Sequence, residues 1–112
     1  METQIQSLHF NLRPSLQNFI YEKMDKLEKL HSRLEAAMVV LKLENTTKKD
    51  NKEAEVSLRM PGLQMFAKET AETFEEAVVN AIEEIKHQLQ RHKEKMANVR
   101  PNGNEVEESD IS

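Results

Sequence analysis

The sequence has no cysteine, no tryptophan and only two glycines among its 112 residues. Without cysteine, the chain has no thiol nucleophile, no disulfide and no thiolate ligand for a metal. Neither Gly62 nor Gly103 opens a predicted helix, so the glycine-rich loop that cradles a nucleotide phosphate is missing. No apolar run approaches the roughly 20 residues that a membrane-spanning helix needs. These absences exclude thiol enzymes, nucleotide hydrolysis by a known phosphate loop, and helical membrane proteins.

The size and the ends of the chain suggest one folded domain followed by a tail. A chain of this length suits a single hydrophobic core. The first ten residues lack the basic start and apolar stretch of a secretory signal, so we expect a soluble, cytoplasmic protein. Residues 98–112 contain Pro101, Gly103 and four acidic residues, with few apolar ones. We therefore predict a domain over 1–97 and a disordered acidic tail over 98–112.

Hydrophobic periodicity predicts six elements. Alternating or continuous apolar runs favour strands over 3–10, 37–44, 53–60 and 63–70, and three- and four-residue steps favour helices over 14–33 and 74–96. Pro14 suits the first turn of a helix, although Arg13 before it offers no capping oxygen. Pro61 and Gly62 predict a hairpin turn, and Thr73 with Glu76 fits a capping box.

This order, β-α-β-β-β-α, predicts an α+β fold. Two strands joined by a helix should be parallel, and the following strands should form an antiparallel meander. The sequence thus predicts a two-layer sandwich in which a four-stranded sheet carries both helices on one face.

No catalytic or metal-binding constellation is visible. The four histidines, His9, His31, His87 and His92, have no recognisable acid or nucleophile partner. His87 and His92 are five residues apart, which places them on different faces of a helix and does not make a metal pair. We expect no catalytic residue, no metal, no cofactor and no small-molecule substrate.

The charges are unevenly distributed. The chain has 16 Lys and Arg against 20 Asp and Glu, but four of the acids lie beyond residue 103, which leaves 16 of each before it. At 100° per residue, the first helix places Lys23, Lys26, Lys29 and Arg33 on one flank of its apolar stripe and Asp25, Glu28 and Glu35 on the other. Solvated charge with pairs such as Glu22 to Lys26 would also explain this pattern.

The second helix sorts its charges along its length. Acids occupy its first part, and its end carries Lys86, His87, Arg91, His92, Lys93 and Lys95. The helix macrodipole favours this gradient without any ligand. The alternative is a surface that contacts nucleic-acid phosphates, and basic stretches of two adjacent helices would then merge. Such a surface would suit folded RNA, because the sheet has no aromatic residues to stack unpaired bases except Phe66, for which we expect a core role.

Several segments together resemble a known family. They are Arg-Pro-Ser-Leu at 13–16, Glu-Lys-Met-Asp-Lys-Leu-Glu-Lys-Leu at 22–30, Val-Val-Leu-Lys-Leu-Glu at 39–44, Met-Pro-Gly at 60–62 and Gln-Leu-Gln-Arg-His-Lys-Glu-Lys at 88–95. In this order and spacing, over residues 3–96, the chain resembles the short ribosome hibernation promoting factors and ribosome-associated inhibitors, also labelled sigma-54 modulation proteins.

The resemblance implies a fold similar to double-stranded RNA-binding domains and a non-enzymatic, steric activity. It implies a protein that is a monomer when free and docks on the small ribosomal subunit, where it blocks the channel of tRNA and mRNA in stationary phase or stress. By the same resemblance, Lys23, Lys26, Lys86, Arg91 and Lys93 match positions that face small-subunit rRNA. Glu84, His87 and Gln90 depart from it, because relatives often carry Lys or Arg there.

Two other function classes stay open. The predicted strand over 63–70 could accept a partner strand at the sheet edge, which would make the protein an interaction adaptor. Adaptor binding should tolerate salt, whereas RNA binding should weaken steeply as salt rises. An enzyme would need a concave site with convergent titratable groups.

Overall fold

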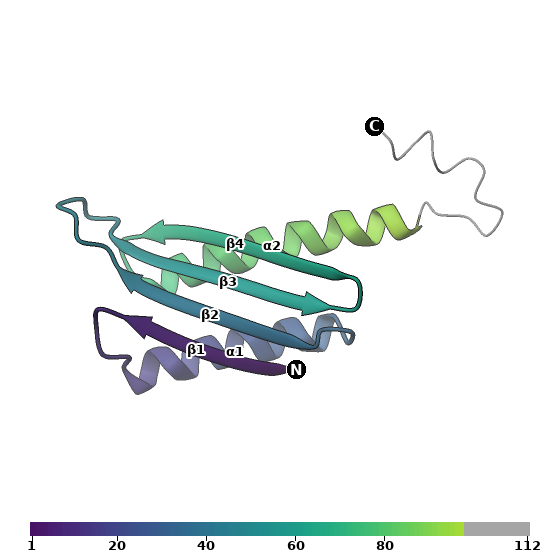
Figure 1. Ribbon diagram of the computed structural model, residues 1–112, viewed down its shortest axis with the longest axis horizontal. Coiled ribbons are helices and arrows are strands. Elements are labelled where there is room, and N and C mark those ends of the chain that lie inside the picture. Colours follow the sequence, from purple (N-terminus) through teal and green to yellow (C-terminus); the bar gives the residue numbers. More distant parts are fainter. Residues whose placement is uncertain (98–112) are drawn as a thin grey trace.

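The computed structural model describes residues 1–97 and confirms the predicted order of elements (Figure 1). The elements are β1 (Glu2–Leu8), α1 (Pro14–Leu30), β2 (Ala36–Leu43), β3 (Lys52–Met60), β4 (Leu63–Ala71) and α2 (Phe74–Ala97). The predicted tail over 98–112 lies outside the described residues. No helix within residues 1–97 is long and apolar enough to cross a bilayer.

The four strands form one mixed sheet in the order β1-β2-β3-β4. β1 runs parallel to β2, and the other two pairs are antiparallel, as predicted. Ile5 pairs with Val39, and Val39 pairs with Val56. Because side chains alternate along a strand, this apolar row lies on one face of the sheet and its neighbours lie on the other.

Both helices cover that apolar face, behind the sheet in the view of Figure 1. The core consists of aliphatic side chains from both layers. Leu16, Ile20 and Met24 of α1 are fully buried, as are Val78 and Ile85 of α2. Each such side chain contributes about 1.5–3 kcal/mol when removed from water. The predicted two-layer α+β sandwich is therefore confirmed, and no helix within residues 1–97 covers the second face of the sheet.

The first predicted strand and the first predicted helix both end earlier than the sequence pattern suggested. β1 stops at Leu8 because His9 adopts φ 73°, outside the extended region. Phe10 then stacks on Phe74, with ring centroids 4.4 Å apart, which ties this loop to the start of α2. The predicted helix over 14–33 ends at Leu30, and the Leu34 amide donates to the His31 carbonyl in the turn that follows.

Leu30 and Leu34 follow the buried Leu27 at three- and four-residue steps, a spacing that favours one apolar stripe, but α1 ends at Leu30. Leu34 is 5% exposed and belongs to the core, but the chain delivers it there from a loop. Leu30, which the pattern placed on the apolar stripe, is 65% exposed. The chain has to leave the helix before residue 33 because β2 begins at Ala36, alongside Glu2.

The start of α2 is capped as predicted. Thr73 Oγ1 accepts a hydrogen bond from the Glu76 amide at 3.1 Å. We expect Thr73→Ala to lower the free energy of unfolding by about 1 kcal/mol, because one amide of the first turn loses its acceptor. Urea denaturation measures this change. Thr73→Ser keeps the oxygen and should retain most of the stability, and an equal loss in both variants would contradict the capping role.

Candidate nucleic-acid interface

The orientation of α1 is fixed by its acidic flank. Glu28 pairs with the N-terminal ammonium of Met1, at the start of the outer strand β1. Lys23 lies about 140° from Glu28 around the helix, with the buried stripe between them. The Lys23 flank therefore faces α2. Its Nζ lies 5.3 Å from the centroid of the Phe19 ring, and Lys26 follows about 60° further towards solvent.

The other two predicted basic residues of the first helix lie further from Lys23. Lys29 is about 120° from Lys23 around α1, on the side of Asp25, and its place on the common flank stays a prediction. Arg33 lies in the turn after the end of α1 at Leu30, where helical spacing does not apply.

The orientation of α2 is fixed by Gln88. Its side-chain amide donates to the Phe66 carbonyl of β4 at 2.9 Å, so this flank of the helix faces the outer edge of the sheet. Arg91 and Lys95 lie within about 60° of Gln88 and share that flank. Lys86 and Lys93 are seven residues apart, on the opposite flank, and face α1.

The two histidines of α2 are separated as expected. His87 is exposed on the outer surface of the helix, and His92 is half-buried. They therefore do not form a pair. Within residues 1–97, no group of three or more His, Asp or Glu side chains is arranged to hold a metal ion.

His31 shows that the basic residues of the two helices converge. Partial burial lowers the pKa of His31, and the positive charges of Lys93 and Lys86 lower this pKa further. The end of α1 therefore lies within the electrostatic field of both lysines, and α1 and α2 are in contact. Lys23, Lys26, His31, Lys86 and Lys93 form what we call the basic patch. The sequence alone gave no sign that His31 belongs to it, because its position depends on how the helices pack.

Few carboxylates neutralise the basic patch. Glu83 lies 3.6 Å from Lys86, and both side chains are exposed, so the pair is weak. On the other flank, Arg91 lies 3.8 Å from Glu84. In the part of the chain that the structure describes, no carboxylate lies within 4.0 Å of Lys23, Lys26 or Lys93. The patch thus keeps ammonium groups available for an anionic partner.

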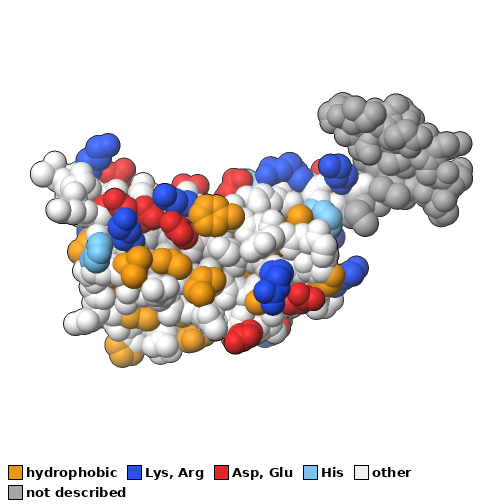
Figure 2. Space-filling model, viewed as in Figure 1, with side chains coloured by type: hydrophobic (Ala, Val, Ile, Leu, Met, Phe, Trp, Pro, Cys, Tyr) orange, Lys and Arg blue, Asp and Glu red, His pale blue; other side chains and the backbone are white. Residues whose placement is uncertain are grey.

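The open face of the sheet has a different electrostatic character. Figure 2 shows acidic and basic side chains intermingled at the end where the β2–β3 loop lies. A hollow of about 630 Å³ there is lined by Lys42, Lys48, Lys68, Glu44, Asp50, Glu53 and Glu55, among others. Opposite charges alternate in this hollow, so it is not a surface of one sign.

Glu53 is the buried carboxyl of that hollow, with 6% of its surface exposed. Burial is the main cause that raises the pKa of Glu53 to about 7, and the neighbouring Glu44 carboxyl adds to it. Lys68, whose Nζ lies 3.9 Å away, opposes this shift. The pKa of Glu44 is lowered, chiefly by its hydrogen bond with Glu53. The two shifts have opposite directions, so Glu53 takes up a proton more readily than Glu44 as the pH falls.

Phe66 is another residue whose environment differs from the sequence-based prediction. Its expected core role is wrong, because 52% of its surface is exposed. β4 forms over the predicted residues, and its side chains alternate with Met65 and Ala67 buried, which places Phe66 on the open face.

The fold and the charge distribution define a small α+β domain with one basic helical face and one open sheet face. The model of the family described as Sigma 54 modulation protein / S30EA ribosomal protein matches residues 3–97. The chain belongs to this family, as the resemblance in its sequence indicated.

Curated relatives bear the name ribosome hibernation promoting factor. The one from Acinetobacter guillouiae is 22% identical over 107 residues, which cover 90% of this chain and 95% of the relative. The one from Klebsiella oxytoca is 26% identical over 96 residues, which cover 86% and 97%.

Two solved structures share the fold. A ribosomal subunit interface protein from Coxiella burnetii aligns with a TM-score of 0.72 at 15% identity and covers 83% of this chain and 98% of its own. The N-terminal domain of Protein Y from Thermus thermophilus aligns with a TM-score of 0.70 at 19% identity and covers 82% and 99%.

Glu53 should make stability depend on pH. Its folded pKa of about 7 lies above the usual 4.5, so its contribution is fully present below pH 4.5 and is lost as pH rises through 7. We expect Glu53→Gln to be more stable than wild type at pH 8 by about 1–3 kcal/mol and similar to it at pH 4.5. Urea denaturation at both pH values measures this difference. A constant difference between the two would contradict the assignment.

Proposed function

We propose that this protein is a ribosome hibernation factor that binds small-subunit rRNA through the basic patch. The observation that carries the proposal is that Lys86 and Lys93 of α2 act on His31 at the end of α1, while Lys23 lies on the flank of α1 that faces α2. Within residues 1–97, no carboxylate lies within 4.0 Å of Lys23 or Lys93. Membership of the family and the names of the relatives support the ribosome as the partner.

The chemistry of the patch suits a phosphate backbone. Lysine ammonium groups act as compact point charges, and each phosphate that they neutralise releases a condensed counterion. The patch lies on two helices that are packed on a sheet, so its charges keep a fixed spacing. A rigid surface of this kind recognises the shape and phosphates of folded RNA more readily than its bases.

The proposed activity is steric. A domain docked in the channel of tRNA and mRNA on the small subunit excludes both ligands, and it needs no bond-making step. The protein would then hold idle ribosomes inactive in stationary phase or stress, in the cytoplasm and without a cofactor. Tests of this activity therefore measure occupancy and competition with tRNA.

The adaptor hypothesis is weakened at the proposed edge. The Phe66 carbonyl on the outer side of β4 already accepts a hydrogen bond from Gln88. An added strand would have to displace this side chain before it could pair with that carbonyl. Binding to a protein partner that is insensitive to salt would favour the adaptor over the rRNA-binding proposal.

The basic patch is tested by charge reversal with a matched variant on the same helix. We expect Lys86→Glu/Lys93→Glu to weaken binding to purified small ribosomal subunits at least tenfold and to lower the salt slope by about 2, because two phosphate contacts are lost. Co-sedimentation across a salt series measures both quantities, and tRNA competition then tests the channel.

The matched variant is Arg91→Glu/Lys95→Glu, which changes the net charge equally on the opposite flank of α2. We expect a smaller loss of affinity from it. An equal or greater loss would overturn the assignment to the flank that faces α1. Absence of wild-type binding at low salt would overturn ribosome binding itself.

A further inference from the structure

The open face of the sheet has an uncharged centre next to an exposed aromatic ring. Strand register places Gln4, Met38, Ser57 and Phe66 in one row across the four strands. Neighbouring side chains in such a row are about 5 Å apart, and Gln64 lies two residues before Phe66 on the same face. The ring of Phe66 therefore lies beside neutral polar groups, away from the basic patch on the helices.

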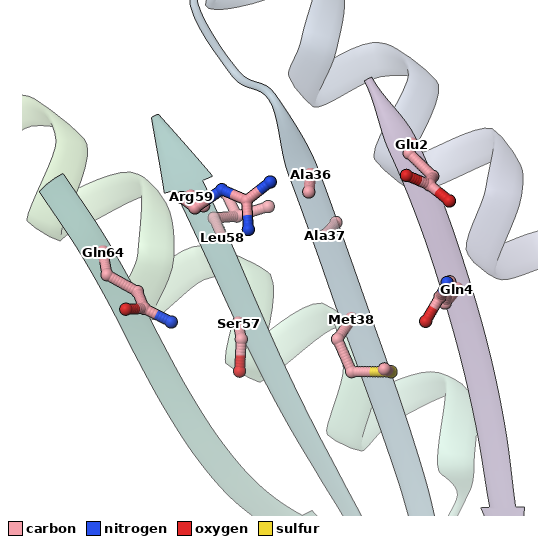
Figure 3. A pocket seen from close by; sticks show the side chains of 9 residues that line it. All are labelled: Glu2, Gln4, Ala36, Ala37, Met38, Ser57, Leu58, Arg59 and Gln64. Carbon is pink, nitrogen blue, oxygen red and sulfur yellow. The ribbon is translucent and has the colours of Figure 1, made fainter. Parts of the chain in front are cut away.

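A hollow of about 240 Å³ lies on the same face, and its lining includes Glu2, Gln4, Met38, Ser57, Arg59 and Gln64 (Figure 3). Phe66 is not part of this lining, but Ser57 is its partner across the strands. Pockets for drug-sized ligands measure about 300–1,000 Å³, so this one suits a smaller group such as a single heterocycle. Within residues 1–97, the side chains of Gln4, Ser57 and Gln64 make no hydrogen bond. They are free to serve a ligand.

A cation lies where a phosphate would follow a bound base. Arg59 Nε lies 3.4 Å from Glu35, and the side chain is 62% exposed, so its terminal nitrogens remain accessible. Lys68 lies two residues beyond Phe66 on the same face of β4. A cation therefore flanks the ring in each direction along the strands.

The backbone at Phe66 is anchored. At the outer edge of the sheet, the Gln88 side-chain amide donates a hydrogen bond of 2.9 Å to the Phe66 carbonyl. The ring therefore projects from a strand that is fixed both by β3 and by α2. A fixed backbone at this position leaves only the side-chain torsions of Phe66 to be ordered when a ligand stacks on the ring.

We propose that the open sheet face binds an unpaired nucleobase of single-stranded RNA. The base stacks on Phe66, its polar edge meets Gln64 and Ser57, and Arg59 contacts an adjacent phosphate. A flat apolar ring surrounded by uncommitted amide and hydroxyl groups matches a nucleobase, which has apolar faces and a polar edge. The basic patch lies on the other layer of the sandwich, so the protein could contact folded RNA and a single strand simultaneously.

The test measures binding of a fluorescently labelled hexa-adenylate RNA by anisotropy, with a short RNA hairpin as the duplex probe. We expect Phe66→Ala to weaken hexa-adenylate binding about tenfold, because stacking on one aromatic ring is lost. Phe66→Tyr keeps a ring and should retain the affinity. Hairpin binding should change less than twofold in both variants. If Phe66→Ala loses the circular dichroism spectrum of the folded protein, Phe66→Tyr and the comparison of hexa-adenylate with an abasic oligomer test the proposal instead.

Tyr21→Ala is the matched control, because Tyr21 is an exposed aromatic residue on α1, away from the open face. It should leave hexa-adenylate binding unchanged. An abasic oligomer of equal charge should bind more weakly than hexa-adenylate. Equal binding of the abasic oligomer, or unchanged hexa-adenylate binding by Phe66→Ala, would overturn the proposal. Neither result would affect the basic patch, because Lys86→Glu/Lys93→Glu tests that surface separately with small ribosomal subunits.

Discussion

The rest of the structure depends on packing two helices against one face of a four-stranded sheet. The row that contains Ile5, Val39 and Val56 supplies the apolar surface that both helices cover. Since both helices need that one surface, they lie next to each other, and their flanks meet. This single packing constraint brings together lysines that are more than 60 residues apart in the sequence. It also leaves the second face of the sheet without a helix.

Two polar contacts accompany the rotation that the buried side chains of each helix impose. The Met1 ammonium holds Glu28 of α1 near the outer strand, and the Phe66 carbonyl holds Gln88 of α2 at the opposite edge of the sheet. Both contacts lie on outer flanks, so the inner flanks carry Lys23 on one side and Lys86 on the other. The lowered pKa of His31 is consistent with this arrangement, because Lys86 and Lys93 both contribute to it. Weak surface contacts thus accompany a charge pattern that the buried stripe determines.

The sequence predicted the elements well because most of them depend on local chemistry. Gly62 with φ 75° forms the predicted turn, and Thr73 caps α2. The site was predicted less well, since a helical wheel assumes that the helix continues. Arg33 left the predicted flank because α1 ends at Leu30, and that end is set by where β2 must begin. Phe66 was misplaced because its hydrophobicity suggested burial, although the alternation of β4 placed it on the open face.

The net charge of the chain is a poor guide to its partners, because the charges are distributed unevenly over its surface. Counted over the whole sequence, the acids exceed the bases by four. Within residues 1–97, the helical layer nevertheless presents Lys23, Lys26 and Lys93 without a carboxylate within 4.0 Å, while on the sheet side burial raises the pKa of Glu53 to about 7. An anionic partner responds to the local field within about a Debye length, roughly 8–10 Å at physiological salt, and not to the sum over the molecule. A protein with an acidic total charge can therefore present a surface suited to RNA, provided that its fold groups basic side chains on one flank away from carboxylates.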